Sequence, residues 1–332
     1  MKRKYDLVAI GDTVMDAFIQ LHEASVHCDL KREHCQLCMS FADKIPYESL
    51  VVIPAVGNAS NVAVGAARLG LDVAMLTAVG NDHYGGEILN VYRKEGIDTK
   101  FVRVNRGMPT NYHFVLTFHA ERTILIKHQK YEYTDPRRMD KKTDWIYFSS
   151  IAEHTLPFHH EVAEYLARHP DVRMGFNPGT FQLRFGADKL AGIYKRTHVL
   201  FVNREEAAIV LKKKTEDIPT LFSGLHKLGP KIVVITDGPN GAYASDGNSR
   251  YFMPPYPDPR PPISRTGAGD AFSTGFLCAL IYGLPVQDAL RWAPIESMHV
   301  VQYFGAQTGL LKKSALVALL KKAPKKYLPK AL

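Results

Sequence analysis

Residues 265–270 read Arg-Thr-Gly-Ala-Gly-Asp, and an apolar run from Ala271 to Gly283 follows them at once. Two glycines on either side of an alanine let the backbone approach a ligand closely, and the run behind them has the length and composition of a buried helix. The N–H groups of residues 267–269 would then point outward at the positive end of the helix dipole, an arrangement that binds phosphate. A carboxylate beside that phosphate is repelled unless it has a task, and Asp270 could remove the proton from a hydroxyl that attacks the phosphate. The alternative is a glycine-rich turn whose aspartate only caps the helix.

Outward from this stretch, the chain alternates short apolar segments with helical patterns. This order predicts an α/β fold with a mostly parallel sheet that is covered on both faces. The strands expected in this sheet cover residues 5–10, 73–79, 145–149, 172–176, 199–202 and 232–236, and a hairpin covers residues 243–252. Helices are expected over residues 62–70, from about 83 to 93, near 160–168, and over 205–211.

Four further β-rich segments, residues 14–21, 50–56, 111–120 and 122–127, predict a small second sheet. It would form a lid over the ends of the main strands, made of about residues 13–56 and 110–128. Residues 23–47 are polar without a clear period, and we expect them to be an insertion outside the main sheet. The whole chain, residues 1–332, is interpreted as a single domain with a basic C-terminal tail over residues 311–332.

Charge and hydropathy limit the possible partners. The 332 residues carry a formal charge of +9, and much of the excess lies in the tail. We expect a solvated basic segment there rather than a nucleic-acid-binding element. No apolar run approaches the ~18 residues of a membrane span, so no membrane partner is expected. The apolar residues 7–10 are too few for a signal sequence, and a cytoplasmic protein is therefore expected.

Four cysteines are too few for a disulfide scaffold in a chain of this length. Cys278 lies in the apolar run 271–283 and is expected in the core. Cys28, Cys35 and Cys38, with histidines at positions 27 and 34, have a spacing that could hold a structural zinc ion. Free thiols in a reducing compartment are the alternative.

Polar residues also follow two of the other expected strands. Asn203 and Glu206 follow the strand 199–202, and their oxygens suit Mg²⁺ that is held through water on a nucleotide. Thr236 and Gly238 lie at the end of the strand 232–236. Each pair alone is a weak pattern. The common phosphate motif Gly-x4-Gly-Lys-Ser/Thr and the dinucleotide motif Gly-x-Gly-x2-Gly are both absent from the sequence.

Taken in order, these motifs resemble those of the ribokinase, or PfkB-type, carbohydrate kinase family. The set comprises Gly57 with Asn61, Asn203 with Glu206, Thr236 with Gly238, and Thr-Gly-Ala-Gly-Asp over residues 266–270. Residues 67–70 and 79–85 are similar to that family too, so the resemblance covers about residues 5–310. It implies a ribokinase-like three-layer α/β/α sandwich with a small β-sheet lid. It also implies an ATP-dependent phosphotransferase that uses Mg²⁺.

Position by position, the resemblance assigns roles to named residues. It makes Asp270 the general base, and it makes Gly267, Ala268 and Gly269 the anion hole for the migrating phosphoryl group. The residues implied at the nucleotide are Asn203, Glu206, Thr236, Gly238 and Thr266, with Glu206 as the residue that organises the metal ion. The residues implied at the acceptor are Asp16, Gly57 and Asn61, with the neighbouring Asp12 as a further candidate.

The chain departs from the family pattern just before the anion hole. Ser264 and Arg265 stand where many relatives have Asp-Thr, whose aspartate helps to hold a monovalent cation, so potassium activation stays open. The acceptor stays open too: a sugar is expected, and a nucleoside, as in adenosine kinase-like enzymes, or a sugar phosphate are the alternatives. A non-catalytic sugar- or nucleotide-binding regulator is the rival from another class. A homodimer formed through the lid is expected.

Overall fold

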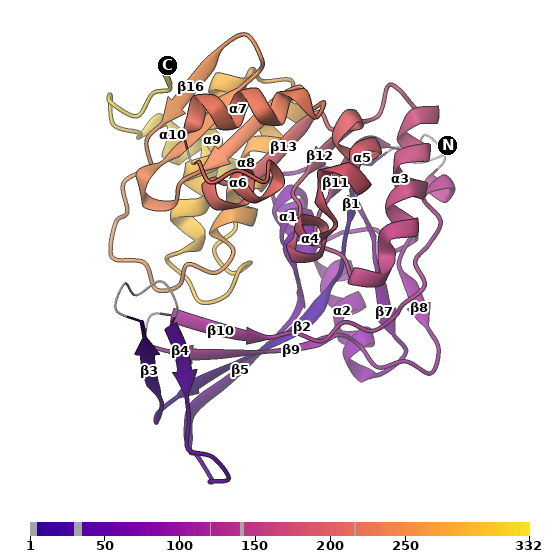
Figure 1. The fold of residues 1–332 in the computed structure, drawn as a ribbon, viewed down its shortest axis with the longest axis vertical. Coiled ribbons are helices and arrows are strands. Elements are labelled where there is room, and N and C mark those ends of the chain that lie inside the picture. Colours follow the sequence, from indigo (N-terminus) through magenta and orange to yellow (C-terminus); the bar gives the residue numbers. More distant parts are fainter. Residues whose placement is uncertain (1–4, 30–34, 120, 140–142, 216) are drawn as a thin grey trace.

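The structure, a computed structural model, describes residues 5–29, 35–119, 121–139, 143–215 and 217–332. Its main sheet has the strand order β17-β16-β15-β14-β13-β12-β11-β1-β6. Figure 1 labels β1, β11, β12, β13 and β16 of this sheet. The strands are β1 (Tyr5–Ile10), β6 (Val73–Leu76), β11 (Thr143–Phe148), β12 (Arg173–Phe176), β13 (Val199–Asn203), β14 (Ile232–Thr236), β15 (Ala242–Ser245), β16 (Arg250–Met253) and β17 (Lys330–Ala331). From β14 to β6 they run parallel, and β15, β16 and β17 extend the sheet antiparallel. Parallel strands are buried on both faces, which explains unbroken apolar runs such as residues 7–10.

Helices cover both faces of this sheet, and each face has its own hydrophobic core. One core includes side chains of α1 (Asn58–Arg68), α2 (His83–Lys94), α8 (Ala268–Ile281), α9 (Val286–Val300) and α10 (Lys313–Lys321). The other includes side chains of α3 (Leu156–Arg168), α4 (Thr180–Lys189), α5 (Ala191–Arg196), α6 (Arg204–Val210) and α7 (Ile218–Lys227). Short 3-10 helices cover Pro136–Met139, Glu153–Thr155 and Gly238–Asn240. The predicted three-layer α/β/α architecture is therefore confirmed.

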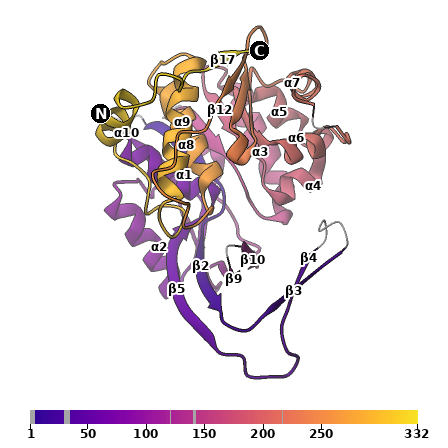
Figure 2. The same ribbon diagram turned by 90° about the vertical axis from the view of Figure 1, so that its left-hand side faces the viewer.

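A separate small sheet begins just after β1 ends. Its strand order is β10-β9-β2-β5, from β2 (Val14–Leu21), β5 (Tyr47–Val56), β9 (Tyr112–Phe118) and β10 (Glu121–Leu125). Strands β3 (Ser25–Cys28) and β4 (Cys35–Cys38) form a hairpin of mostly exposed residues, which Figure 2 shows as an arm extending beyond the small sheet. A two-stranded ladder of β7 (Ala78–Gly80) and β8 (Arg103–Asn105) completes the β structure described here. The predicted second sheet is confirmed, and the described residues of the insertion, 23–29 and 35–47, lie outside the main sheet.

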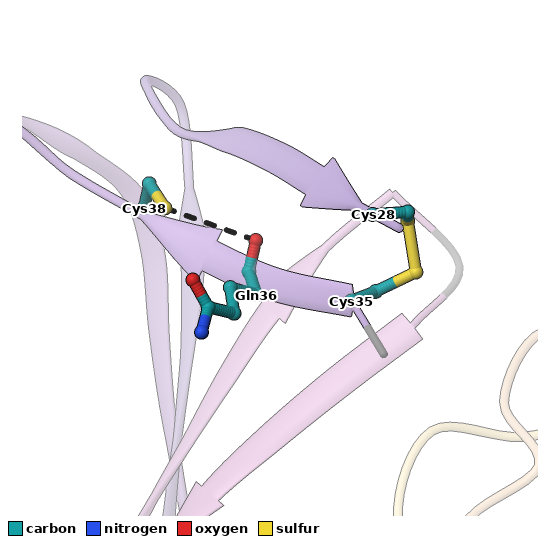
Figure 3. The surroundings of a disulfide bond; sticks show 4 residues. All are labelled: Cys28, Cys35, Gln36 and Cys38. Atoms are coloured by element: carbon teal, nitrogen blue, oxygen red, sulfur yellow. Dashed lines mark hydrogen bonds between the residues drawn. A yellow bond between two sulfur atoms is a disulfide. The ribbon is translucent and has the colours of Figure 1, made fainter. Parts of the chain in front are cut away.

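The zinc prediction for Cys28, Cys35 and Cys38 is wrong. Cys28 and Cys35 are directly opposite each other in the antiparallel register of β3 and β4, and their sulfur atoms form a disulfide bond (Figure 3). Cys38 pairs instead with Ser25 at the other end of the hairpin. The register therefore keeps the third sulfur atom away from the other two, and two of the three cysteines are not free thiols either. Of the histidines considered with them, His34 lies outside the described residues.

The basic segment 311–332 is integrated into the fold. Helix α10 packs on α9, and β17 pairs with β16 at the edge of the main sheet. Leu311, Leu316 and Tyr327 are buried, whereas the lysines of the segment lie on the surface. Within the described part of the chain, every helix is too short or too polar to cross a lipid bilayer.

Candidate active site

Helix α8 begins at a position that suits only glycine. Gly267 caps the helix with a φ of 80°, and a β-carbon there would lie 2.5 Å from the Cβ atom of Ala306. The N–H groups of the first helical turn have no helical partners, as at any helix N-terminus. Gly269 has no neighbouring atom within 4 Å of where a β-carbon would stand. Open space and N–H donors are therefore both available to an anion at this helix end.

Asp270 lies in that first turn, and two side-chain amides hold its carboxylate. The Nδ2 atom of Asn58 donates to Oδ1 at 2.8 Å, and the Nδ2 atom of Asn61 donates to Oδ2 at 2.7 Å. Gln307 supports this arrangement, because its Nε2 atom donates to Oδ1 of Asn61 at 3.0 Å. Burial raises the pKa of Asp270, and the two amide donors act against that shift. The carboxylate is thus fixed in direction and is more basic than an exposed aspartate.

A cavity of about 410 Å³ opens between this helix end and the small sheet. Its lining includes every residue predicted at the acceptor or in the anion hole, and Thr266 as well: Asp12, Asp16, Gly57, Asn61, Thr266, Gly267, Ala268, Gly269 and Asp270. Further side chains come mainly from the strands of the small sheet and from α4: Phe18, His113, Arg122, Ile124 and Phe181. We call this space the acceptor cavity.

A second cavity, of about 400 Å³, adjoins the same helix end. Of the five residues predicted at the nucleotide, Thr236 and Gly238 line it, and Thr266 lines the acceptor cavity instead. Apolar side chains complete the lining, among them Tyr256, Phe272, Pro294, Met298 and Val301. We call it the nucleotide cavity. Three residues line both cavities: Arg265, Ala268 and Gly269. The two cavities therefore meet at the glycine-rich turn.

Asn203 and Glu206 are not among the residues that line these two cavities. They form a capping box at the start of α6: the Glu206 N–H donates to Oδ1 of Asn203 at 2.7 Å, and the Asn203 N–H donates to the Glu206 carboxylate at 2.9 Å. Asn203 is also paired with Thr236 across β13 and β14, which places the box beside the nucleotide cavity. Burial raises the pKa of Glu206, and the negative charge of Asp270 adds to the rise. Among the described residues, no three His, Cys, Asp or Glu side chains cluster as metal ligands.

Asp12 lines the acceptor cavity with a carboxylate that is already engaged. The Tyr133 hydroxyl donates to Oδ1 at 2.5 Å, and Nδ1 of His128 lies 2.8 Å from Oδ2. His128 and His113 line the cavity beside it, with ring centroids 5.3 Å apart. Asp12 is therefore part of a preformed hydrogen-bonded group, and this was not expected from the sequence.

Several residues of the site were missed in the sequence. Asn58 carried a signal, because it lies three residues before Asn61 and both would share one helix face if the helix began at Gly57. His113 carried none, since strand alternation shows that a side chain faces one side of a sheet but not which side forms a site. His128 lies in the loop after β10, where no period orients a side chain. Gln307 lies in a loop distant in sequence from every motif.

Known proteins similar to this chain are sugar and nucleoside kinases. The family model described as pfkB family carbohydrate kinase matches residues 23–313. The ribokinase of Bacillus subtilis (strain 168) is 31% identical over 271 residues, which cover 80% of this chain and 87% of that protein. A nucleoside kinase of Methanothermobacter thermautotrophicus is 28% identical over 263 residues, which cover 76% of this chain and 80% of that protein.

Solved structures agree with the fold. The structure of Arabidopsis thaliana ribokinase complexed with ribose and ATP matches with a TM-score of 0.79 at 18% identity, over 96% of this chain and 99% of that one. This match supports the ribokinase-like fold, and the family match confirms the resemblance found in the sequence. The chain therefore belongs to the pfkB family of carbohydrate kinases and is an enzyme, a sugar or nucleoside kinase of the ribokinase family.

Proposed function

We propose that this enzyme transfers the γ-phosphoryl group of ATP to a hydroxyl group of a sugar. The observation that carries the proposal is that the two cavities meet at Ala268 and Gly269, beside the buried carboxylate of Asp270. A donor in one cavity and an acceptor in the other would bring the reacting groups to the N-terminus of α8. Phosphoryl transfer depends mainly on such positioning and on stabilisation of negative charge.

Asp270 would accept the proton of the acceptor hydroxyl as its oxygen bonds to the γ-phosphorus. The bond between that phosphorus and the β–γ bridging oxygen breaks, and ADP leaves. The N–H groups over residues 267–269 would stabilise the charge on the transferred group, as the positive end of a helix favours an anion. Arg265 lines both cavities and would add a positive charge at the same point.

Magnesium would enter this reaction with the nucleotide. One carboxylate and one carboxamide, Glu206 and Asn203, are too few to enclose a metal ion, and one Glu206 oxygen already accepts the N–H of Asn203. Such a donor set fits Mg²⁺ that is held mainly by phosphate oxygens and water, with Glu206 binding a water of the ion. The ion would neutralise charge on the β- and γ-phosphates.

Side chains in the lining of the acceptor cavity would also suit two other kinds of acceptor, a nucleoside and a sugar phosphate. Apolar side chains of the lining, among them Phe18 and Ile124 of the small sheet and Phe181 of α4, would suit the base of a nucleoside. Arg122 in the same lining would suit the phosphate of a sugar phosphate. The polar residues around Asp270 would suit the hydroxyl groups that all three acceptors share.

ADP release with a panel of acceptors tests the proposal. The panel contains ribose, fructose, fructose 6-phosphate, 5-dehydro-2-deoxygluconate and nucleosides. Asp270→Asn is expected to lower kcat by about 10²–10⁴-fold, the usual contribution of a general base, with little change in ATP affinity. Asp288→Asn, at a partly exposed position in α9 that pairs with Arg291, serves as the control and should retain activity. Near-normal turnover by Asp270→Asn would show that Asp270 is not the general base.

We also propose that the small sheet joins two copies of this chain in a homodimer. The strand register places Val52, Phe114 and Leu125 in one row on the face opposite the acceptor cavity, and Leu50 in the next row. These four side chains are 40–53% exposed. A contiguous apolar patch on a sheet is unfavourable in water, and a two-fold axis would bury the same patch on both copies.

Light scattering after size exclusion tests the dimer. Phe114→Glu should shift the mass from dimer to monomer, because it places a charge in the buried interface. Val104→Glu is the control, since Val104 is 43% exposed but lies on β8, outside the small sheet. A monomeric wild-type protein would contradict this proposal.

A further inference from the structure

Asp12, Tyr133 and His128 form a buried group at one wall of the acceptor cavity. Asp12 is only 4% exposed, and each of its oxygens has a partner within the chain. The contact between Oδ2 of Asp12 and Nδ1 of His128 resembles the way in which a carboxylate orients an imidazole toward a ligand.

The orientation of His128 leaves one polar atom for the cavity. Its Nδ1 atom faces Asp12 at 2.8 Å, so the proton lies on Nδ1 when the ring is neutral, and Nε2 is then a hydrogen-bond acceptor. Ring contacts hold the imidazole on two further sides, because its centroid lies 5.4 Å from Phe181 and 5.3 Å from His113. The group is therefore set before any ligand arrives.

A second polar pair lies beside it with unmet hydrogen-bonding capacity. Asp16 and His113 are directly opposite each other on β2 and β9, and His113 Nδ1 lies 3.6 Å from Asp16 Oδ1, too far for a good hydrogen bond. Oδ1 of Asp16 and Nε2 of His113 are both buried without a hydrogen-bond partner among the described residues. Buried polar atoms without partners are costly, and here they belong to residues that line the acceptor cavity.

We propose that His128 and His113 bind hydroxyl groups of the acceptor, and that Asp12 and Tyr133 are positioning residues that act through His128. The inference rests on the proposed function. It adds that the acceptor carries several hydroxyl groups and that two of them contact this wall of the acceptor cavity. One hydroxyl would donate to Nε2 of His128. Another would bridge Asp16 and His113, since a hydroxyl can both donate and accept.

Two substitutions of one residue separate this role from simple structural support. His128→Asn keeps an amide donor where Nδ1 faces Asp12 but removes the group at the Nε2 position. His128→Gln does the reverse. Kinetics are measured with the most active member of the acceptor panel, and the melting temperature is measured for each variant.

His128→Asn is expected to lower kcat/KM for the acceptor by about a hundredfold, and His128→Gln by less than about tenfold, with KM for ATP unchanged. A lost hydrogen bond to a buried polar partner has effects of this order. Asp12→Asn should resemble His128→Gln in its effect on kcat/KM for the acceptor, because both variants change the contact at Nδ1 and keep a polar group at the Nε2 position. Wild-type kinetics in His128→Asn, or equal losses in both His128 variants together with a lower melting temperature, would overturn the inference.

Failure of the proposed function is a separate outcome. If the wild-type enzyme releases no ADP with any panel member, the proposed kinase reaction fails. Calorimetric titration with the same compounds then tests ligand binding at this wall independently of catalysis. A compound that binds the wild type and loses affinity in His128→Asn, but not in His128→Gln, would support the inference, and no binding by any of them would overturn it.

Discussion

Asp16 is the residue whose charge state should control acceptor affinity near neutral pH. Burial raises its pKa from the usual value for an aspartate to about 7. The neighbouring His113 has its pKa lowered to about 4, first by burial and then by His128, so it stays neutral through this range. Between pH 6 and 8, Asp16 is therefore the group of this pair that changes charge.

We expect kcat/KM for the acceptor to rise as the pH increases through about 7. The ionised carboxylate accepts hydrogen bonds from hydroxyl groups on both oxygens, whereas the protonated acid has lost part of that capacity. Asp16→Asn should lower kcat/KM and remove this pH dependence, while KM for ATP stays constant. Steady-state kinetics from pH 5.5 to 8.5 check this, and an unchanged profile in Asp16→Asn would assign the titration to another group.

At the scale of the element, the start of α8 contains two glycines, of which one has no room for a β-carbon and the other has open space around it. Gly267→Ala should destabilise the fold by about 1–3 kcal/mol, because the positive φ and the contact with Ala306 both oppose a β-carbon. Gly269→Ala should leave the unfolding free energy within about 0.5 kcal/mol, since open space surrounds that position. It should nevertheless reduce kcat/KM for ATP, if the transferred phosphoryl group occupies the same space. Denaturant unfolding and kinetics on both variants make the test, and a fully active Gly269→Ala would contradict the anion hole.

The elements also show where sequence patterns predict well and where they do not. Strands β1, β13 and β14 and helix α8 were predicted because each buries a largely apolar run. Helix α1 begins at Asn58, four residues before the predicted start at 62. The apolar pattern missed its first turn because Asn58 and Asn61 are polar and bind Asp270. The residues of the hairpin β3–β4 are mostly exposed, and their hydrophobicity has no period that would predict strands. The cysteine spacing was therefore interpreted without the strand register, which places Cys28 opposite Cys35.

At the scale of the molecule, the site is assembled from segments far apart in the sequence. The motif residues could be predicted to converge because parallel strands present their carboxyl ends at one edge. The partners of Asp12 could not, since Tyr133 and His128 lie more than a hundred residues away, in a segment without motif or period. Such contacts depend on the course of loops in space, which no local sequence pattern predicts.

Glu296 is a buried acid that the proposed reaction does not use. It is fully buried in α9, one oxygen accepts the Leu311 N–H at 3.2 Å, and Oε1 has no partner among the described residues. Burial raises its pKa to about 8, and the N–H of Leu311 and the charge of Arg68 act against the rise. Burial, and then the charge of Glu296, raise the pKa of the Cys278 thiol well above its usual value, so this thiol stays protonated.

The raised pKa of Glu296 predicts a fold that loses stability as the pH rises from about 4.5 to about 8. Between the unfolded pKa of 4.5 and the folded value of about 8, the native state holds a proton that the unfolded chain has released. The unfolding free energy should therefore fall by about 1.4 kcal/mol per pH unit across this window and level off above it. Glu296→Gln, which mimics the neutral acid, should remove this contribution, whereas Glu164→Gln at an exposed position should not. Urea unfolding from pH 5 to 9 checks the prediction, and parallel slopes for wild type and Glu296→Gln would show that Glu296 does not hold its proton in the folded state.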